Sequence, residues 1–184
     1  MKSLICFLSL VIPGLLLLNS CSQIPKGVTA VKPFKTEKYL GEWYEIARMD
    51  YPFERNMKNV TANYSLRSGG KIRVDNRGYN VKTKKWKEAI GKAKSAGDSN
   101  EGKLKVSFFG PFYAAYNVIA IDDAYTHALV AGKNLNYLWI LSREKTIPEK
   151  TKEHYLKIAK DIGFDTSKLI WVEQDRADKA PKSR

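Results

Sequence analysis

Side chains that could carry out chemistry are few in this chain of 184 residues. The two histidines, His127 and His154, lack the spacing of metal ligands. Ser142 and Lys145 match an S-x-x-K pattern, but the companion motifs S-D-N and K-T-G are absent and the serine ends a predicted strand. The sequence also lacks a G-x-S-x-G elbow, a P-loop, an H-E-x-x-H pair and a dinucleotide fingerprint. We therefore expect a protein that is not an enzyme, with no catalytic residue, metal or cofactor.

The first 20 residues differ in character from the rest of the chain. Lys2 precedes an apolar run from Leu4 to Leu18, which is shorter than the ~20 residues of a membrane-spanning helix. We predict that residues 1–20 are a cleaved signal peptide. An uncleaved N-terminal anchor is the alternative.

Residues 18–21, Leu-Asn-Ser-Cys, resemble the lipobox of bacterial lipoproteins. The resemblance implies that Cys21 becomes the acylated N-terminus and attaches the protein to a bacterial membrane, because several acyl chains hold a protein stably. An ordinary signal peptide with a chance cysteine is the alternative. Ser22 stands where an Asp retains such lipoproteins at the inner membrane, so the resemblance implies the outer membrane, on the periplasmic side. With Cys6 removed and Cys21 acylated, no cysteine pair is left for a disulfide.

The net charge of +13 favours contact with anionic surfaces such as phospholipid headgroups. A solvated surface without a specific partner explains the charge equally well. A nucleic-acid partner would also suit a basic, aromatic chain, but export to a membrane argues against it.

Short alternating runs separated by turn signals follow Tyr39 and predict an all-β fold. The eight predicted strands span residues 43–49, 60–66, 72–77, 85–94, 104–109, 116–121, 127–132 and 137–142. Because the connections are short, we expect an eight-stranded up-and-down antiparallel barrel, or failing that a sandwich.

The periodicity becomes helical over residues 147–164, where Tyr155, Ile158, Ala159 and Ile162 share one face. We expect one C-terminal α-helix packed outside the barrel, with a membrane or partner surface as the alternative. Residues 168–174 predict a short ninth strand. The charged residues 175–184 are predicted to be disordered, and residues 21–35 to be the lipidated N-terminus and its tether. The folded domain is then expected over residues 36–174.

Several stretches together resemble the lipocalin family. Gly41-Glu42-Trp43-Tyr44 matches the G-x-W-Y signature of the first strand, and Arg143 matches the arginine that follows the eighth strand. Asp122 matches the aspartate of the family's T-D-Y motif, but the flanking residues differ from the motif. The segments YLGEWYEIARMDYPFERN, LKVSFFGPFY and YLWILSR, with the lipobox, resemble the outer-membrane lipoprotein lipocalins of the apolipoprotein-D-like branch.

This resemblance implies a membrane-anchored protein that binds a fatty acid or a lysophospholipid and serves lipid storage, transport or maintenance in the cell envelope. A lipocalin-fold enzyme that acts on a lipid or another small hydrophobic substrate is the alternative. Both a homodimer and a monomer are compatible with the sequence.

Alternation along the first and eighth strands places Trp43 and Arg143 on inward faces of neighbouring strands. The guanidinium can stack on the indole, a contact of ~1–2 kcal/mol when sheltered. In lipocalins this pair closes the narrow end of the barrel, and Gly41 would leave space there. These three residues are predicted to be structural.

The cavity is predicted from the same alternation, with the register taken from the resemblance. Its expected lining is apolar and aromatic with a few polar tips, which suits an amphiphile. The lining residues are Ala47, Met49, Tyr64, Val74, Asn76, Val106, Phe108, Tyr116, Val118, Tyr137 and Trp139. A filled interior without a ligand is the alternative to this cavity. Arg48 is expected on the outer face. Tyr51, Pro52 and Phe53 are expected either to form an apolar lip at the open end or to lie in a surface loop with scattered aromatic residues. A register shift of one residue would invert any strand.

Overall fold

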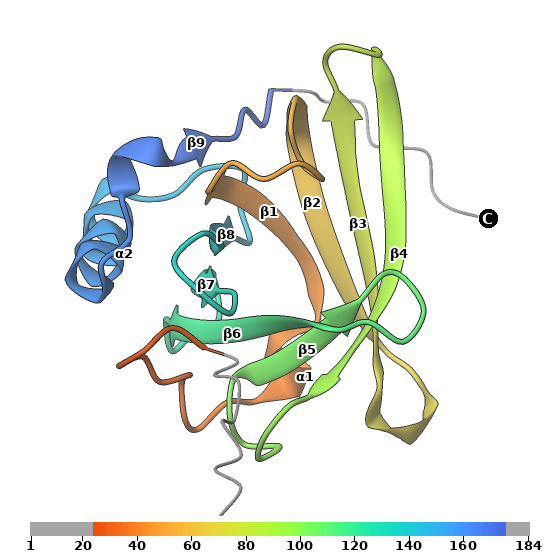
Figure 1. Cartoon of the computed structure of the whole chain (residues 1–184), viewed down its shortest axis with the longest axis vertical. Coiled ribbons are helices and arrows are strands. Elements are labelled where there is room, and N and C mark those ends of the chain that lie inside the picture. Colours follow the sequence, from red (N-terminus) through yellow and green to blue (C-terminus); the bar gives the residue numbers. More distant parts are fainter. Residues whose placement is uncertain (1–23, 176–184) are drawn as a thin grey trace, which may run out of the picture.

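The computed structural model describes residues 24–175, which form one antiparallel sheet closed into a barrel (Figure 1). The strand order is β2-β3-β4-β5-β6-β7-β8-β1-β9, and β1 also pairs with β2, which closes the ring. The strands are β1 (Gly41–Arg48), β2 (Met57–Leu66), β3 (Ile72–Asn80), β4 (Lys85–Ser95), β5 (Lys103–Ser107), β6 (Ala114–Ile121), β7 (His127–Ala131), β8 (Leu138–Ser142) and β9 (Ile170–Trp171). The helices are α1 (Thr36–Tyr39), α2 (Glu149–Ile162), η1 (Ser68–Gly70) and η2 (Thr166–Lys168). The predicted eight-stranded up-and-down barrel is confirmed.

The two ends of the barrel follow from this topology. In an up-and-down barrel every second connection lies at the same end, so residues 49–56, 81–84, 108–113 and 132–137 form what we call the open end. The other connections and α1 form the closed end. The signal peptide, Cys21 and Ser22 lie outside the described residues, as do residues 176–184 of the predicted tail. Over residues 24–175, the helices lack the length and apolar character that crossing a bilayer would require.

A bulge in β1 decides which side chains enter the barrel. Glu45 pairs with Leu141 of β8, but the next pair joins Ala47 to Ile140, so Ile46 is an additional residue in the ladder. An additional residue of this kind reverses the face of the sheet to which each later side chain of the strand points. The reversal places Ala47 outside the barrel and Arg48 inside it.

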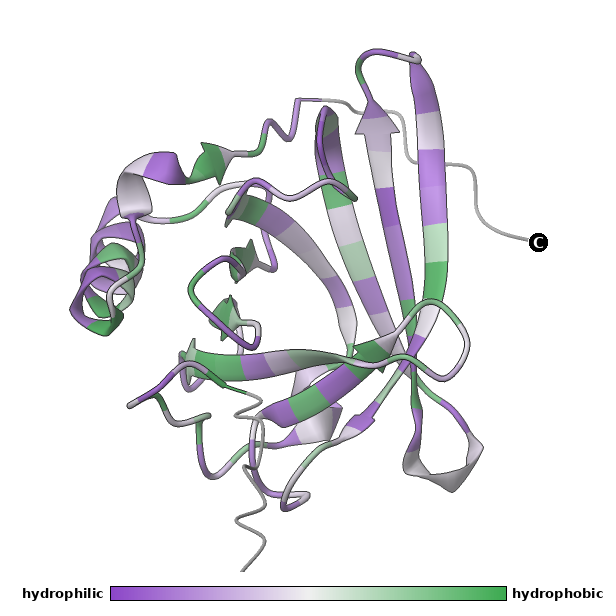
Figure 2. Ribbon diagram, in the orientation of Figure 1, coloured by the Kyte–Doolittle hydropathy of each residue, from purple (hydrophilic) through white to green (hydrophobic). Residues whose placement is uncertain are grey.

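Two hydrophobic cores lie on either side of the barrel wall. The inner core contains Trp43, Val74 and Val130. The outer core lies between the sheet and α2, and Tyr155 and Ala159 bring the apolar face of α2 into it. Helix α2 therefore packs outside the barrel as predicted (Figure 1). Hydrophobic residues are prominent on β5 to β8, whereas β3 and β4, away from α2, are largely hydrophilic (Figure 2).

Both ends of the described chain are held against the barrel. Val31 donates a main-chain hydrogen bond of 2.8 Å to Val118, and Phe34 is buried in the inner core. The expected tether of residues 21–35 therefore joins the folded domain before residue 36. Strand β9 is shorter than predicted, and Asp175 accepts a hydrogen bond of 2.8 Å from Asn59.

Candidate functional site

The closed end is sealed by Trp43 and Arg143. The guanidinium carbon lies 3.8 Å from the centroid of the indole ring, so the expected cation–π contact is present. The guanidinium also donates hydrogen bonds to the main-chain carbonyls of Lys38, Leu40, Glu42 and Tyr125. Arg143 thereby ties α1, β1 and the β6–β7 turn together, which explains a structural role for it.

Gly41 allows this approach. Its φ of +92° lies in the left-handed region, and a Cβ at this position would come within 3.3 Å of Arg143 Nη1. Both the left-handed backbone conformation and the limited room beside Arg143 thus favour glycine at this position.

Three tyrosine hydroxyls form a polar layer above the tryptophan. Tyr116 is linked to Tyr39 at 2.7 Å and to Tyr64 at 2.9 Å, oxygen to oxygen. Burial raises the pKa of all three phenols above the ordinary value, so they stay protonated and satisfy one another. This layer is the floor of the barrel interior.

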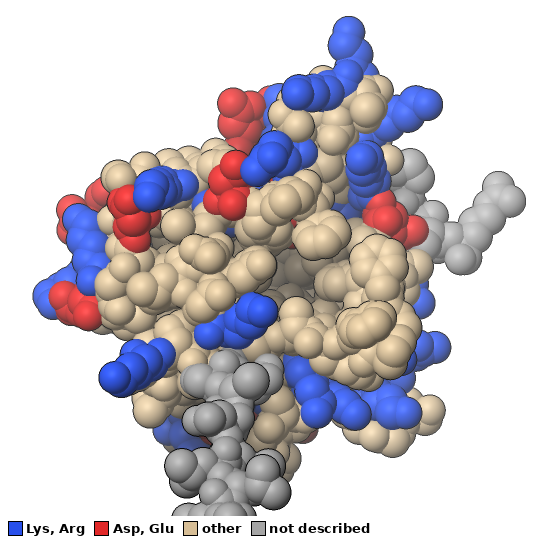
Figure 3. Space-filling model, viewed as in Figure 1, with Lys and Arg blue, Asp and Glu red and all other residues tan. Residues whose placement is uncertain are grey.

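Above the floor the interior is hollow. Tyr116, Phe108 and Trp139 face the inner core yet are only partly buried. Ala89 is exposed although its register, opposite Asn76, places it on the inward face of β4. Solvent therefore reaches between the inward-facing side chains, and the space-filling view shows a recess in this face of the barrel (Figure 3).

Most of the residues predicted to line the cavity lie in this interior. Those in the inner core or packed against it are Tyr64, Val74, Val106, Phe108, Tyr116, Val118 and Trp139. Asn76 shares the inward face of β3 with Val74, and Tyr137 stacks on Trp139 at 6.4 Å between ring centroids.

The prediction for Ala47 and Met49 is wrong. Both pack in the outer core beneath α2, because the bulge at Ile46 turns this part of β1 around. Strict alternation has no means of detecting a bulge. The one local signal is the pair of adjacent apolar residues, Ile46 and Ala47, which interrupts the alternation.

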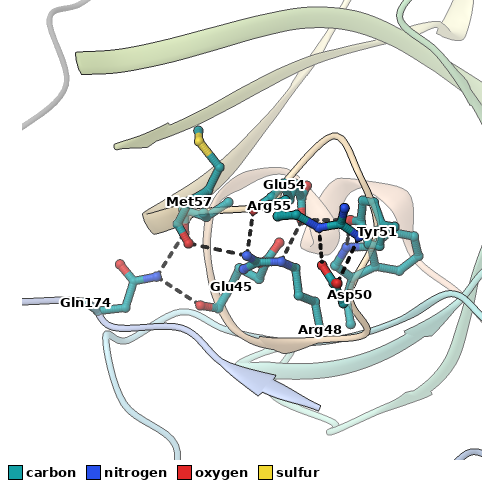
Figure 4. A network of polar contacts seen from close by, with 10 residues as sticks. Glu45, Arg48, Asp50, Tyr51, Glu54, Arg55, Met57 and Gln174 are labelled. Carbon is teal, nitrogen blue, oxygen red and sulfur yellow. Dashed lines mark hydrogen bonds and ion pairs between the residues drawn. The ribbon is translucent and has the colours of Figure 1, made fainter. Parts of the chain in front are cut away.

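Arg48 is the interior residue that the sequence prediction missed. It is 1% exposed and donates a hydrogen bond of 2.8 Å to Glu45, which lies on the inward face (Figure 4). The other terminal nitrogen donates to the carbonyls of Glu54 and Met57, at 2.6 and 3.3 Å. Arg48 therefore holds the β1–β2 loop from beneath.

A second carboxyl completes this group. Glu54 Oε2 lies 3.7 Å from Arg48 Nε and accepts a hydrogen bond of 2.7 Å from the Tyr51 hydroxyl. Burial and the nearby Glu54 raise the pKa of Glu45 well above its ordinary value, against the opposing effect of Arg48. Two carboxyls thus share one guanidinium.

Tyr51 carries this loop into the barrel mouth. It is 8% exposed, its ring meets Trp139 edge-on at 5.3 Å, and its hydroxyl accepts a hydrogen bond from the indole nitrogen of Trp139. The expected apolar lip is therefore only partly present: Tyr51 packs inward, whereas Phe53 is 83% exposed. Arg55 pairs with Asp50 on the surface (Figure 4).

The residues first considered for chemistry have structural partners. Ser142 is fully buried and donates a hydrogen bond to the carbonyl of Thr146. His127 Nδ1 lies 2.9 Å from the Thr126 hydroxyl. Within residues 24–175, no group of three His, Cys, Asp or Glu side chains is placed to hold a metal ion.

A hollow eight-stranded up-and-down barrel, closed at one end by an arginine on a tryptophan and covered on one side by a helix, defines a lipocalin. Residues 34–174 match the family model described as a lipocalin-like domain. The chain belongs to the lipocalin family.

Its similarity to bacterial relatives extends over most of their length. It is 55% identical to the outer membrane lipoprotein Blc of Citrobacter freundii over 153 residues, which cover 83% of this chain and 86% of the relative. It is 53% identical to the Escherichia coli K12 protein of the same name, over 82% and 85% of the two chains. Mouse apolipoprotein D is 31% identical over 77% of each chain. Among solved structures, insecticyanin from Manduca sexta shares the fold, with a TM-score of 0.67 and 23% identity over 82% of this chain and 86% of that chain.

Proposed function

We propose that this protein is an outer-membrane lipoprotein, anchored through Cys21 on the periplasmic side, that holds a fatty acid or a lysophospholipid in its barrel. Its role is then lipid storage, transport or maintenance in the cell envelope. The observation that carries the proposal is the solvent-reaching interior lined by half-buried Phe108, Tyr116 and Trp139.

An acyl chain suits this lining. Water in an apolar recess is readily displaced by hydrocarbon, which contributes ~0.8 kcal/mol for each methylene removed from water. The aromatic rings of Tyr137 and Trp139 offer a flat wall, and Ala89, on the inward face of β4, leaves room in the interior.

The polar end of the ligand has partners nearer the mouth. Asn76 Oδ1 is buried and has no hydrogen-bond partner among residues 24–175, so it can accept from a ligand hydroxyl. Lys87 pairs with Gly78 in register and shares the inward parity of Ala89, so it stands at the rim. Its ammonium group suits a carboxylate or a phosphate.

This binding is passive, and the protein acts as a carrier without turnover. The relatives reported above are named lipoproteins or apolipoproteins, and Ser142 and His127 have structural partners. A lipocalin-fold enzyme is the competing class.

Native mass spectrometry of the purified mature protein tests the proposal. We expect a co-purified amphiphile, and binding of added fatty acid or lysophospholipid to the delipidated protein. Ala89→Trp fills the recess and should reduce binding at least tenfold, since the ring occupies the acyl site. Ile90→Trp, on the outer face of the same strand, is the matched control and should bind normally.

Two outcomes would overturn the proposal. Failure of the protein to retain or bind any amphiphile removes the carrier function. Conversion of the added lipid into a product moves the protein to the enzyme class.

A further inference from the structure

Three lysines gather over one aromatic ring on the outer wall of the barrel. The ammonium nitrogens of Lys94, Lys92 and Lys105 lie 5.1, 5.8 and 5.9 Å from the centroid of the Tyr113 ring. Lys94 and Lys105 face each other directly in the β4–β5 ladder. The ring face compensates part of the mutual repulsion.

These three lysines lack the ion pairs that Arg73 and Arg77 form on the neighbouring strand β3. On the neighbouring strand, Arg77 pairs with Asp75 and Glu88. None of the ion pairs formed within residues 24–175 involves Lys92, Lys94 or Lys105. An anion placed above Tyr113 would therefore relieve the repulsion among them.

Exposed apolar rings adjoin this cluster. Phe109 and Phe112, in the β5–β6 loop that leads into Tyr113, are 72% and 79% exposed. In the space-filling view, Lys and Arg side chains gather beside that loop (Figure 3). Lysines next to protruding aromatic side chains are the composition of a surface that sits at a membrane interface.

We infer that this surface docks side-on onto an anionic phospholipid bilayer. We call Lys92, Lys94, Lys105, Phe109 and Phe112 the β4–β5 patch. The lysines contact headgroup phosphates, and the two phenylalanine rings enter the outer part of the acyl region. Because the β5–β6 loop is an open-end loop, docking brings the edge of the barrel mouth to the lipid.

The bilayer is the partner that the chain itself favours, an argument that rests on the proposed function. Only Ser22 and Gln23 separate Cys21 from Ile24, the first described residue, so these three residue steps span at most ~10 Å. The anchored domain thus stays beside the membrane. Because the anchor keeps the domain at a high effective concentration near the bilayer, even weak contacts suffice to orient the domain.

Vesicle co-sedimentation tests the inference, using the chain from residue 21 with Cys21→Ser, so that no acyl anchor masks the result. Residue 21 precedes residues 34–174, which match the lipocalin-like domain, so we expect the substitution to leave that domain unchanged. We expect binding to phosphatidylglycerol vesicles, little binding to phosphatidylcholine vesicles, and loss of most binding at about 0.5 M salt. Changing Lys92, Lys94 and Lys105 together to Gln should lower the partition coefficient on the order of a hundredfold.

Matched variants separate location from net charge. Lys150, Lys157 and Lys160 on α2, changed together to Gln, remove the same charge from the far side and should bind nearly as well. Phe109→Ser with Phe112→Ser should weaken binding even at low salt, whereas Leu66→Ser, a 53% exposed residue at the closed end, should not.

The opposite results would overturn the inference. Equal losses in the two lysine triple variants would mean that net charge alone binds. If RNA competes fully with the vesicles, or if the patch variants lose self-association in sedimentation instead of vesicle binding, the patch serves another partner. Fatty-acid binding by each variant is measured in parallel, so that a failure of the carrier function is seen separately.

Discussion

Arg48 lies inside the barrel and donates a hydrogen bond of 2.8 Å to Glu45, although residues three apart on a regular strand point to opposite faces. The bulge at Ile46 brings the two side chains to one face. From there Arg48 also donates to the carbonyls of Glu54, in the β1–β2 loop, and of Met57, the first residue of β2. This pair links the wall of the barrel to the loop at its mouth.

Arg48→Ala should destabilise the fold strongly, because it leaves the buried Glu45 and the carbonyls of Glu54 and Met57 without their donor. We expect the free energy of unfolding to fall by about 3–5 kcal/mol. Urea unfolding at neutral pH measures the change. Arg55→Ala, which breaks the exposed pair with Asp50, is the control and should cost under ~1 kcal/mol. Equal effects of the two variants would contradict this account.

Stability should depend on pH through Glu45. Burial raises the pKa of this carboxyl in the folded protein above its ordinary value of 4.5. Its contribution is therefore fully present below that value and is lost as pH rises through the folded pKa. From the ordinary value of 4.5 upward, the wild type should lose stability relative to Glu45→Gln as pH rises. Urea midpoints across this range test it, and parallel curves for the two proteins would refute it.

The closed end should be sensitive to conservative changes. Arg143→Lys loses the stacked guanidinium and several of the bonds to main-chain carbonyls, and should cost about 2–3 kcal/mol. Gly41→Ala should cost about 1–3 kcal/mol, since a side chain is strained at φ +92° and crowds Arg143. Thermal unfolding measures both changes. Lipid binding at temperatures where the variants stay folded should be preserved, because neither residue faces the hollow.

Tyr51 should control how fast a ligand leaves the mouth. Tyr51→Ala removes the ring that covers Trp139, and we expect dissociation of a fluorescent fatty acid to accelerate about tenfold, as for the loss of ~1.4 kcal/mol. Tyr51→Phe keeps the ring and loses only the hydroxyl contacts, so its effect should be smaller. Stopped-flow displacement measures the rates. Phe53→Ala, on the exposed part of the same loop, should leave them unchanged.

Much of this protein could be read from local patterns. Alternating runs and short turns predict eight antiparallel strands, because side-chain period and turn chemistry are local properties of the chain. The placement of Trp43, Arg143 and most of the interior lining follows from the same alternation once the register is taken from the resemblance to lipocalins and the strands close into a ring. The helical spacing around Tyr155 likewise predicts α2 and its packing face.

The tertiary structure decided the features that the alternation of side chains along a strand does not determine. Whether Ala47 or Arg48 enters the barrel depends on the hydrogen-bond register between β1 and β8, and one additional residue there inverts both. Phe34 and Tyr51, from a segment expected to be a tether and a loop expected to be a lip, are buried because the barrel offers apolar surface at its two ends. Residues distant in the sequence determine which face a side chain takes after a bulge and how a loop packs. The sequence by itself thus determined the strands and the container they form, and only the tertiary contacts determined which charged and aromatic groups stand at its mouth.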